Sequence, residues 1–226
     1  MTDSTPPRPL RALVTAGPTH EPIDAVRYLG NRSSGRIGRA IAGALASRGA
    51  EVTLLAGPGV AEPPHVRTVR FRTANDLDDA LRQQWPAHDL LVMAAAVADF
   101  RPAAPAASGK LRRTDARLTL ELEPVPDLLA GLASLTRPGQ TVVGFALEPA
   151  EDLDRSAREK LVRKGLHAIV ANPIETMESA EVDGHLVTAD GSAHRPAAGR
   201  CSKEAFADWL AGMLMPMAER RRALGA

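Results

Sequence analysis

The fold of this chain is constrained most by a regular alternation between short apolar runs and amphipathic segments. Runs such as ALVTA and LLVMAAA are continuously apolar, which is typical of parallel strands covered on both faces. Strands that alternate with helices in this way predict an α/β fold, with a Rossmann-like, doubly wound and mostly parallel sheet. We expect strands at 10–16, 51–57, 66–71, 89–98, 141–147 and 167–172, and helices at 35–49, 75–85, 126–135 and 151–165.

Two segments depart from this alternation. Residues 100–116 are irregular and rich in proline and alanine, so we expect a flap insertion there. The sequence LTLELE at 118–123 alternates strictly, which predicts a half-exposed antiparallel strand. Two Asp-Gly pairs, Asp183-Gly184 and Asp190-Gly191, predict turns in a C-terminal antiparallel hairpin, and a helix follows it. We expect a single domain over 1–226, with a disordered tail at 1–9.

The composition argues against several classes of partner. The 226 residues are 44% hydrophobic and 24% charged, as in an ordinary globular protein. A net charge of +1 and an aromatic content of 3%, with Tyr28 as the single tyrosine, make nucleic acid an unexpected partner. The chain has no apolar run of the ~20 residues that a membrane span needs and no signal-peptide pattern. We therefore expect no membrane partner. Because the lone Cys201 cannot form an internal disulfide, we also expect a cytoplasmic protein.

Two long connections mark the expected ligand site. The connection at 17–34 follows the first strand and has 18 residues, where ~2–6 are usual. The flap at 100–116 follows another central strand. In open α/β sheets, ligands bind at the carboxyl ends of the strands. Both connections are therefore expected to open onto the same, ligand-binding edge of the sheet.

The sequence YLGNRSSGRIGRAIAGAL comes close to two nucleotide-binding motifs and completes neither. A P-loop requires Lys and then Ser or Thr after its second glycine, whereas Arg36 and Ile37 follow Gly35. A dinucleotide-binding site requires a glycine cluster directly after the first strand and an acid after the second, where the chain has Gly57 and Pro58. An NAD(P)-binding reductase, or a non-catalytic nucleotide-sensing module, therefore remains only as an alternative function.

The start of the helix at 35–49 can bind an anion. Ser33, Ser34 and the amide of Gly35 would offer hydroxyl and N–H donors at the positive end of the helix dipole. Alternatively, one serine is only an N-cap, and the glycines serve close helix–strand packing. Arg27 and Asn31 favour the first interpretation, because a cation and a neutral amide can together hold a carboxylate and its tetrahedral adduct.

Further cations lie elsewhere in the chain. The flap carries Lys110, Arg112 and Arg113, which form either a solvated basic face or a mobile cover for a polyphosphate. Lys160 and Lys164 are four residues apart and share one helical face. The six histidines lack the HxxxH and HExxH spacings, so we expect no metal site of the protein's own; Mg²⁺ would arrive with a nucleotide.

Taken together, these segments resemble the bacterial phosphopantothenate–cysteine ligase domain over about residues 10–215. The resemblance lies in TAGPTHEPIDAVRYLGNRSSGRIG, AAAVADFRP, GKLRR, PVPDLL, VVGFALE and AREKLVRKGLHAIVAN, in this order. It implies a CTP-dependent, Mg²⁺-assisted synthesis in coenzyme A biosynthesis: an acyl-cytidylate forms from 4′-phosphopantothenate, and the amine of cysteine then displaces CMP. The sequence has no room for the flavin-dependent decarboxylase to which this domain is often fused. The resemblance therefore implies a free-standing ligase without flavin, which would work with a separate phosphopantothenoylcysteine decarboxylase.

The resemblance also assigns roles to residues. It implies catalytic roles for Asn31, Lys110 and Arg27, acyl-substrate binding by Ser33, Ser34, Gly35 and Ala96, and nucleotide binding by Asp99, Lys110, Pro126, Asp127, Leu128, Leu129, Phe145, Lys160 and Lys164. It implies a homodimer with strands exchanged near the active site. Three features differ from the family pattern: Leu111-Arg112-Arg113 in the lysine-rich flap, Val125 in place of an asparagine, and Pro173 in place of an aspartate.

Overall fold

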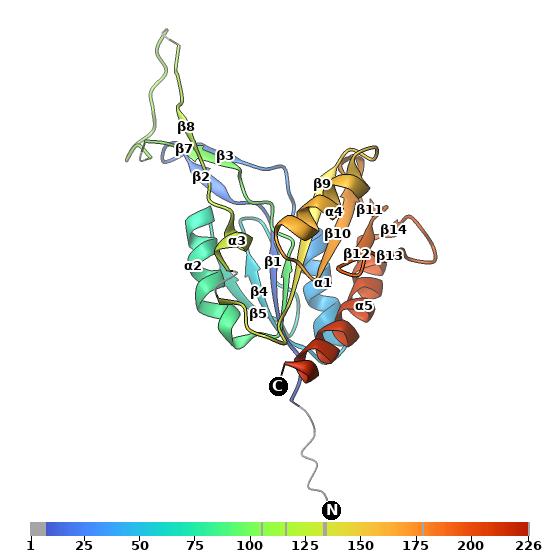
Figure 1. The fold of residues 1–226 in the computed structure, drawn as a ribbon. Helices are drawn as coiled ribbons and strands as arrows, with labels where there is room; N and C mark the ends of the chain where they lie inside the picture. Colours follow the sequence, from blue (N-terminus) through green and yellow to red (C-terminus); the bar gives the residue numbers. More distant parts are fainter. Residues whose placement is uncertain (1–7, 105, 116, 133–134, 178, 226) are drawn as a thin grey trace, which may run out of the picture.

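The computed structural model of this chain contains one central sheet of eight strands (Figure 1). It describes residues 8–104, 106–115, 117–132, 135–177 and 179–225. The strand order is β13-β12-β10-β9-β6-β1-β4-β5. The strands of this sheet are β1 (Arg11–Ala16), β4 (Glu51–Ala56), β5 (Arg67–Arg70), β6 (Leu90–Met93), β9 (Thr141–Glu148), β10 (Ala168–Pro173), β12 (His185–Thr188) and β13 (Ala193–His194).

The sheet is doubly wound, as predicted. From β1 the chain continues to β4 and β5 on one side, then crosses to β6, β9 and β10 on the other, and all of these neighbours pair in parallel. The winding direction therefore reverses between β1 and β6, where an open α/β sheet leaves a crevice. The predicted C-terminal antiparallel hairpin is confirmed at Asp190-Gly191, which joins β12 to β13. The turn predicted at Asp183-Gly184 is not found: these residues have no turn assignment, and the other partner of β12 is β10, which ends at Pro173.

Helices cover both faces of the sheet. The helices α1 (Arg36–Ser47) and α5 (Lys203–Leu224) pack on one face; α2 (Ala74–Gln84), α3 (Leu128–Gly131) and α4 (Leu153–Arg163) pack on the other. The side chains of successive residues in β1 lie on opposite faces of the sheet. Ala12 and Val14 are in the core beneath α1 and α5, and Leu13 is in the core beneath α2, α3 and α4. Strands buried on both faces need apolar residues at every position, which explains the continuous runs. Among the described residues, no helix has the length and apolar character needed to cross a bilayer.

Smaller elements lie outside the main sheet. The long connection after β1 folds into an antiparallel ribbon of β2 (His20–Pro22) and β3 (Tyr28–Gly30). A second ribbon is formed by β7 (Phe100–Pro102) and β8 (Leu122–Pro124) (Figure 1). The two strands are the base of an arm, residues 100–124, which contains the predicted flap and rises above the sheet. The remaining elements are the pair β11 (Glu181–Val182) and β14 (Cys201–Ser202) and the 3-10 turns η1 (Trp85–Ala87) and η3 (Ile174–Thr176).

Three predicted elements are shorter in the structure. The strand predicted at 118–123 is regular only from Leu122, because β7 provides a partner of three residues. The helix predicted at 126–135 is the single turn α3, which begins only after Asp127 caps it and has Gly131 as its last residue. The strand predicted at 89–98 ends at Met93, because the hydroxyl of Thr15 accepts the Ala95 amide at 2.9 Å and draws the chain out of the ladder.

The structure corrects the expected tail for the residues that it describes. Arg8, expected in a disordered tail at 1–9, donates two hydrogen bonds of 2.7 Å to the carboxylate of Asp89. Asp89 also accepts the amide of Arg11 at 2.9 Å, so this buried carboxylate ties the chain to the start of β1. Residues 1–7 lie outside the described part of the chain.

Helix α1 approaches β1 very closely. A Cβ atom on Gly38 would lie 2.7 Å from Cβ of Ala16 and 2.8 Å from the carbonyl oxygen of Thr15. This contact confirms the close helix–strand packing that we considered for these glycines. It also brings the start of α1 against the end of β1, which is the carboxyl edge of the sheet.

We expect Gly38→Ala to lower the free energy of unfolding by about 1–3 kcal/mol, because the new methyl group overlaps backbone that cannot move easily. Gly43→Ala is the matched control in the same helix, since its Cβ would lie 4.0 Å from the nearest atom. That change should stabilise the protein by up to ~1 kcal/mol through helix propensity. Urea denaturation measures both; a Gly38→Ala protein as stable as Gly43→Ala would contradict this packing.

Candidate functional site

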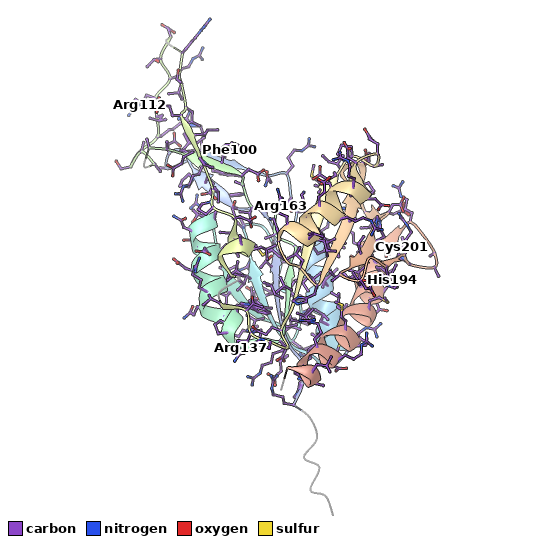
Figure 2. The ribbon with its side chains drawn as sticks, in the orientation of Figure 1. Phe100, Arg112, Arg137, Arg163, His194 and Cys201 are labelled. Atoms are coloured by element: carbon purple, nitrogen blue, oxygen red, sulfur yellow. The ribbon has the colours of Figure 1, made fainter. Side chains whose placement is uncertain are left out.

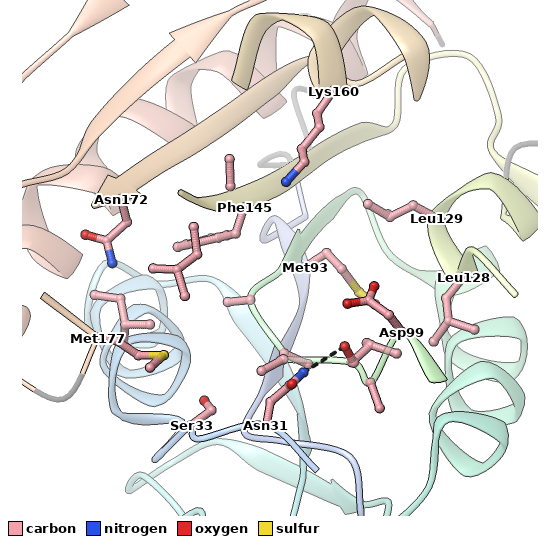
Figure 3. A pocket seen from close by; sticks show the side chains of 18 of the residues that line it. Asn31, Ser33, Met93, Asp99, Leu128, Leu129, Phe145, Lys160, Asn172 and Met177 are labelled. Carbon is pink, nitrogen blue, oxygen red and sulfur yellow. Dashed lines mark hydrogen bonds between the residues drawn. The ribbon is translucent and has the colours of Figure 1, made fainter. Parts of the chain in front are cut away.

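A pocket of about 860 Å³ opens at the reversal point of the sheet. It lies at the carboxyl ends of β6, β9 and β10, and the loop after β6 forms its floor (Figure 3). Most of the residues singled out from the sequence line it: Asn31, Ser33, Ala96, Asp99, Pro126, Asp127, Leu128, Leu129, Phe145, Lys160 and Lys164. The two long connections do meet at one edge, as expected, because Pro18 and Ala96 form an isolated parallel bridge.

Hydrogen bonds to the connection after β1 fix the floor loop. The amide of Ala96 donates to the Gly17 carbonyl at 2.9 Å, and the Thr19 amide returns a bond of 3.2 Å to the Ala96 carbonyl. The hydroxyl of Thr19 accepts the Ala98 amide at 3.0 Å. Side-chain hydroxyls therefore replace the strand ladder where the sheet opens, and the loop keeps a defined shape.

Asn31 lies over this floor directly after β3. Its Nδ2 donates to the Val97 carbonyl at 2.9 Å, the bond drawn in Figure 3. A carboxamide nitrogen carries two hydrogens, so one donor is used to orient the group and the other can face a ligand. The ribbon of β2 and β3 thus holds a neutral donor at the centre of the pocket.

The start of α1 differs from the serine-capped start that the sequence allowed. The N-cap residue is Gly35, with φ of 66°, and no side chain caps the helix. A Cβ atom on Gly35 would lie 2.5 Å from Cγ2 of Val60 and 2.9 Å from the Gly17 amide nitrogen, so this position requires glycine. Ser33 lines the pocket, whereas Ser34 and Gly35 are not among the lining residues. An N-cap role for either serine was wrong.

Lysine–carboxylate pairs lie along one side of the pocket. Nζ of Lys160 lies 2.6 Å from Glu148, and Nζ of Lys164 lies 2.9 Å from Asp127. Both lysines line the pocket, which confirms that they share one helical face. The hydrogen bond from Lys160 holds the pKa of Glu148 below its ordinary value. These pairs keep the ammonium groups ordered and leave them able to exchange a carboxylate for a phosphate.

Arg27 and Lys110 are not among the residues that line this pocket. The guanidinium of Arg27 pairs with the buried carboxylate of Asp24 and donates to the Leu111 carbonyl at 2.7 Å. Asp24 also accepts the Leu111 amide at 3.0 Å, and these hydrogen bonds, chiefly that of Arg27, hold its pKa far below the ordinary value. The buried carboxylate of Asp24 therefore attaches the arm to the β2–β3 ribbon, and the point of attachment is Leu111, the residue after Lys110.

The arm carries basic side chains away from the sheet. Figure 2 shows Arg112 on the projecting arm, whereas Arg163 lies over the carboxyl edge. Lys110, Arg112 and Arg113 are all exposed. In this conformation the basic cluster of the arm and the lysines of the pocket are therefore separate groups of charges.

Several residues of the pocket were not assigned to the site from the sequence. Arg163, which belongs to the basic cluster around Lys160 and Lys164, and Asn172 and Lys203 supply polar groups; the apolar walls come from Ile37, Met93, Ile174, Met177 and Val182. Asn172 follows the apolar run of a predicted strand, so the sequence already placed this polar residue at the carboxyl edge, where a ligand is expected. Lys203 opens a helix, where a cation is unfavourable, and that anomaly was a second signal. Cys201 lies in β14, where its backbone pairs with that of Val182 in β11. Burial raises the pKa of its thiol, so the reactive thiolate is disfavoured and Cys201 is a poor candidate for a nucleophile.

Comparisons with known proteins identify relatives of this chain. Residues 8–217 match the family model of the DNA/pantothenate metabolism flavoprotein C-terminal domain. The coenzyme A biosynthesis bifunctional protein CoaBC of Mycolicibacterium smegmatis is 43% identical over 196 residues, which cover 81% of this chain and 47% of that protein. CoaBC of Escherichia coli is 40% identical over 189 residues, covering 80% and 46%. The chain spans about half the length of these curated relatives.

Solved structures share the fold. The crystal structure of a CoaBC C-terminal domain superposes with a TM-score of 0.77 and 33% identity, covering 93% of this chain and 96% of that one. A mutant of Cab2 in complex with phosphopantothenate-cysteine has a TM-score of 0.75 and 20% identity, covering 95% and 86%. At that identity the second likeness concerns the fold alone.

Proposed function

Because the chain belongs to the family of DNA/pantothenate metabolism flavoprotein C-terminal domains, we propose that it ligates 4′-phosphopantothenate to L-cysteine with CTP as the activating nucleotide. The relatives are named for coenzyme A biosynthesis. The observation that carries the proposal is the pocket itself, which combines lysines suited to a polyphosphate with the positioned amide of Asn31. Activation of a carboxylate by a nucleotide requires both kinds of group.

In the first step, a carboxylate oxygen of 4′-phosphopantothenate attacks the α-phosphorus of CTP. The bond from that phosphorus to the bridging oxygen breaks, and pyrophosphate leaves with the electron pair. Lys160 and Lys164 would neutralise the polyphosphate, and Asp99, exposed at the same pocket, would accept hydrogen bonds from the nucleotide. Mg²⁺ would enter with CTP; the described residues contain no group of three or more His, Cys, Asp or Glu that could hold a metal ion.

In the second step, the amine of cysteine attacks the acyl carbon of the acyl-cytidylate. The bond from that carbon to the phosphate oxygen breaks, CMP leaves with the electron pair, and the amine loses a proton. Negative charge develops on the acyl oxygen as the tetrahedral adduct forms. The Nδ2 hydrogen of Asn31 that Val97 does not use would stabilise this charge.

We propose that a second copy of the chain completes the site. The β2–β3 ribbon and the arm expose apolar side chains, namely Val26, Tyr28, Phe100, Leu118, Leu120 and Leu122. Apolar side chains grouped in this way favour burial against another protein surface. Arg27 and Lys110 lie in the same elements and outside their own pocket. A dimer through these elements would let each subunit present Arg27 and Lys110 to its partner's pocket.

An NAD(P)-binding reductase has less support. Strand β4 ends at Ala56 and is followed by Gly57 and Pro58, so this position offers no carboxylate for ribose hydroxyls. Gly35, before the first turn of α1, packs against Gly17, the residue after β1, so close packing accounts for this glycine without a dinucleotide. The ligase proposal uses the residues that line the pocket, and the reductase alternative uses only the fold.

The wild-type protein tests the reaction. With CTP, Mg²⁺, 4′-phosphopantothenate and cysteine it should release one pyrophosphate for each phosphopantothenoylcysteine formed, and omission of the acyl substrate should abolish the release. Parallel reactions with ATP measure the nucleotide preference. A folded protein that releases no pyrophosphate with either nucleotide would refute the proposal, and binding of NADH under the same conditions would favour the reductase.

Asn31→Asp should slow the second step more than the first. It replaces the donor with a negative charge that repels the developing oxyanion, so we expect the rate of amide formation to fall roughly 10²–10³-fold. Rapid-quench assays should then show a burst of pyrophosphate and slow release of CMP. Asn75→Asp is the matched control outside the pocket, where the side chain accepts a hydrogen bond from Arg101. Equal loss of both steps would contradict the assigned role.

A mixing experiment tests the shared site. Lys110→Gln alone should raise the KM for CTP about tenfold by removing a charge-assisted contact. If Lys110 acts in the partner's pocket, mixing Asn31→Asp with Lys110→Gln at a CTP concentration well below the KM of Lys110→Gln should give more activity than either variant alone, because each heterodimer then contains one intact site. Random exchange of subunits would give about a quarter of the wild-type rate. A mixture no more active than its separate components would show that Lys110 acts within its own subunit or not at all.

A further inference from the structure

Lys203 is a buried cation in the wall of the pocket. It is the first residue of α5, is 6% exposed, and follows Ser202, whose hydroxyl caps the helix by accepting the Ala205 amide at 3.1 Å. Lysine is almost never fully buried unless it has a partner of opposite charge. A buried lysine that lines a pocket therefore needs an explanation.

The neighbours of Lys203 within the chain do not balance its charge. Its Nζ donates to the Met177 carbonyl at 3.3 Å. Among the described residues, no ion pair of this nitrogen with a carboxylate is found; Glu204, next in the chain, interacts with it only at longer range. Burial, and after it the positive charge of Arg36, lower the pKa of Lys203. The surroundings therefore disfavour the charged form of Lys203, and the single long hydrogen bond to Met177 does little to offset this cost.

Stability does not explain a lysine at this position. A cation in the first turn of a helix opposes the helix dipole, and its burial removes water from a charged group. A methionine would fill the same space without either cost. Groups that lower stability but remain in a pocket are expected where they serve binding or catalysis.

A side-chain amide lies on the same side of the pocket as Met177, the hydrogen-bond partner of Lys203. Asn172 accepts the Thr176 hydroxyl at 2.9 Å through Oδ1, which leaves the hydrogens of its Nδ2 for the pocket. Figure 3 shows Asn172 and Met177 on the side of the pocket opposite Leu128, Leu129 and Asp99, with Asn31 between the two sides. Lys203, which bonds Met177, therefore belongs to the side opposite Leu128, Leu129 and Asp99; of the residues assigned to the nucleotide, Phe145 lies nearest to this side.

We propose that Lys203 binds the phosphate monoester of the acyl substrate and makes the enzyme specific for the phosphorylated form. This inference rests on the proposed function. 4′-Phosphopantothenate has an anion at each end: the carboxylate must meet the α-phosphate of the nucleotide near Asn31, and the phosphate must then lie elsewhere. The end with Lys203 and Asn172 offers a cation and an amide donor for a phosphate.

The test compares two acyl substrates, 4′-phosphopantothenate and pantothenate, which lacks the phosphate. Wild-type protein should show a much larger kcat/KM for the first. In Lys203→Met this ratio should fall roughly tenfold to hundredfold, because a charge-assisted contact to phosphate is lost, while the KM for CTP changes less than about twofold. Lys203→Arg should recover part of the ratio. The melting temperature of Lys203→Met should equal or exceed that of the wild type.

Lys164→Met is the matched control at the other end of the pocket. It should raise the KM for CTP and leave the preference for the phosphorylated substrate unchanged. An equal fall of kcat/KM for both acyl substrates in Lys203→Met, or a loss of thermal stability, would overturn the proposal and indicate a structural role.

The proposal can also be separated from the ligase function. If the wild type catalyses no ligation, 4′-phosphopantothenate should still raise its melting temperature more than pantothenate does, and Lys203→Met should abolish the difference. If the wild type shows no such difference, the role of Lys203 is refuted together with the substrate. If the wild type ligates both acyl substrates equally well, only the role of Lys203 is refuted.

Discussion

The site depends on the junction between the ends of β1 and β6. There the two strands separate, and the hydrogen bonds among Gly17, Thr19, Ala96 and Ala98 replace the sheet ladder. The reversal of winding leaves a crevice at this point in any doubly wound sheet. In this chain the junction also fixes Val97, the residue that orients Asn31. The central amide of the pocket is therefore positioned by the topology of the sheet and not by its local sequence.

Charge is arranged differently at the two ends of the pocket. Lys160 and Lys164 are held by Glu148 and Asp127, so they are ordered before a ligand arrives. Lys203 lacks such a carboxylate among the described residues and is buried. A paired lysine exchanges one anion for another when it binds a polyphosphate. A buried lysine without a counter-ion gains more from an incoming anion, because the anion removes an electrostatic penalty already present in the folded protein.

The arm and the β2–β3 ribbon form a unit that is separate from the main sheet. Asp24 links them through Arg27 and the amide of Leu111, so the position of Lys110 depends on a carboxylate far away in the sequence. The exposed leucines at 118, 120 and 122 continue the alternation noted in the sequence. The alternation predicted a half-exposed strand over 118–123, but only Leu122 and Glu123 of it are in a strand, because β7 is too short to pair with the rest, and the residues before them are exposed on both sides.

The sequence by itself determined the layers and the edge at which the site lies. Continuous apolar runs can be buried only in strands covered on both faces, and long connections after such strands must meet at their carboxyl ends. It also excluded the P-loop, because that chemistry needs Lys and a hydroxyl after the second glycine of the motif. Most of the residues singled out for the site do line the pocket, since they follow strands or share one helical face.

Only the tertiary structure decided which cations face the pocket. Arg27 and Lys110 were indistinguishable from pocket residues in the sequence, yet a buried Asp24 and the backbone of Leu111 hold the first and anchor the segment next to the second. Lys203 was an unfavourable cation at a helix start in the sequence, and only the packing of α5 beside Met177 showed that it is buried in the wall of the pocket. The physical reason is that local pattern sets which face of an element is apolar, whereas the environment of a charge depends on contacts between segments far apart in the chain.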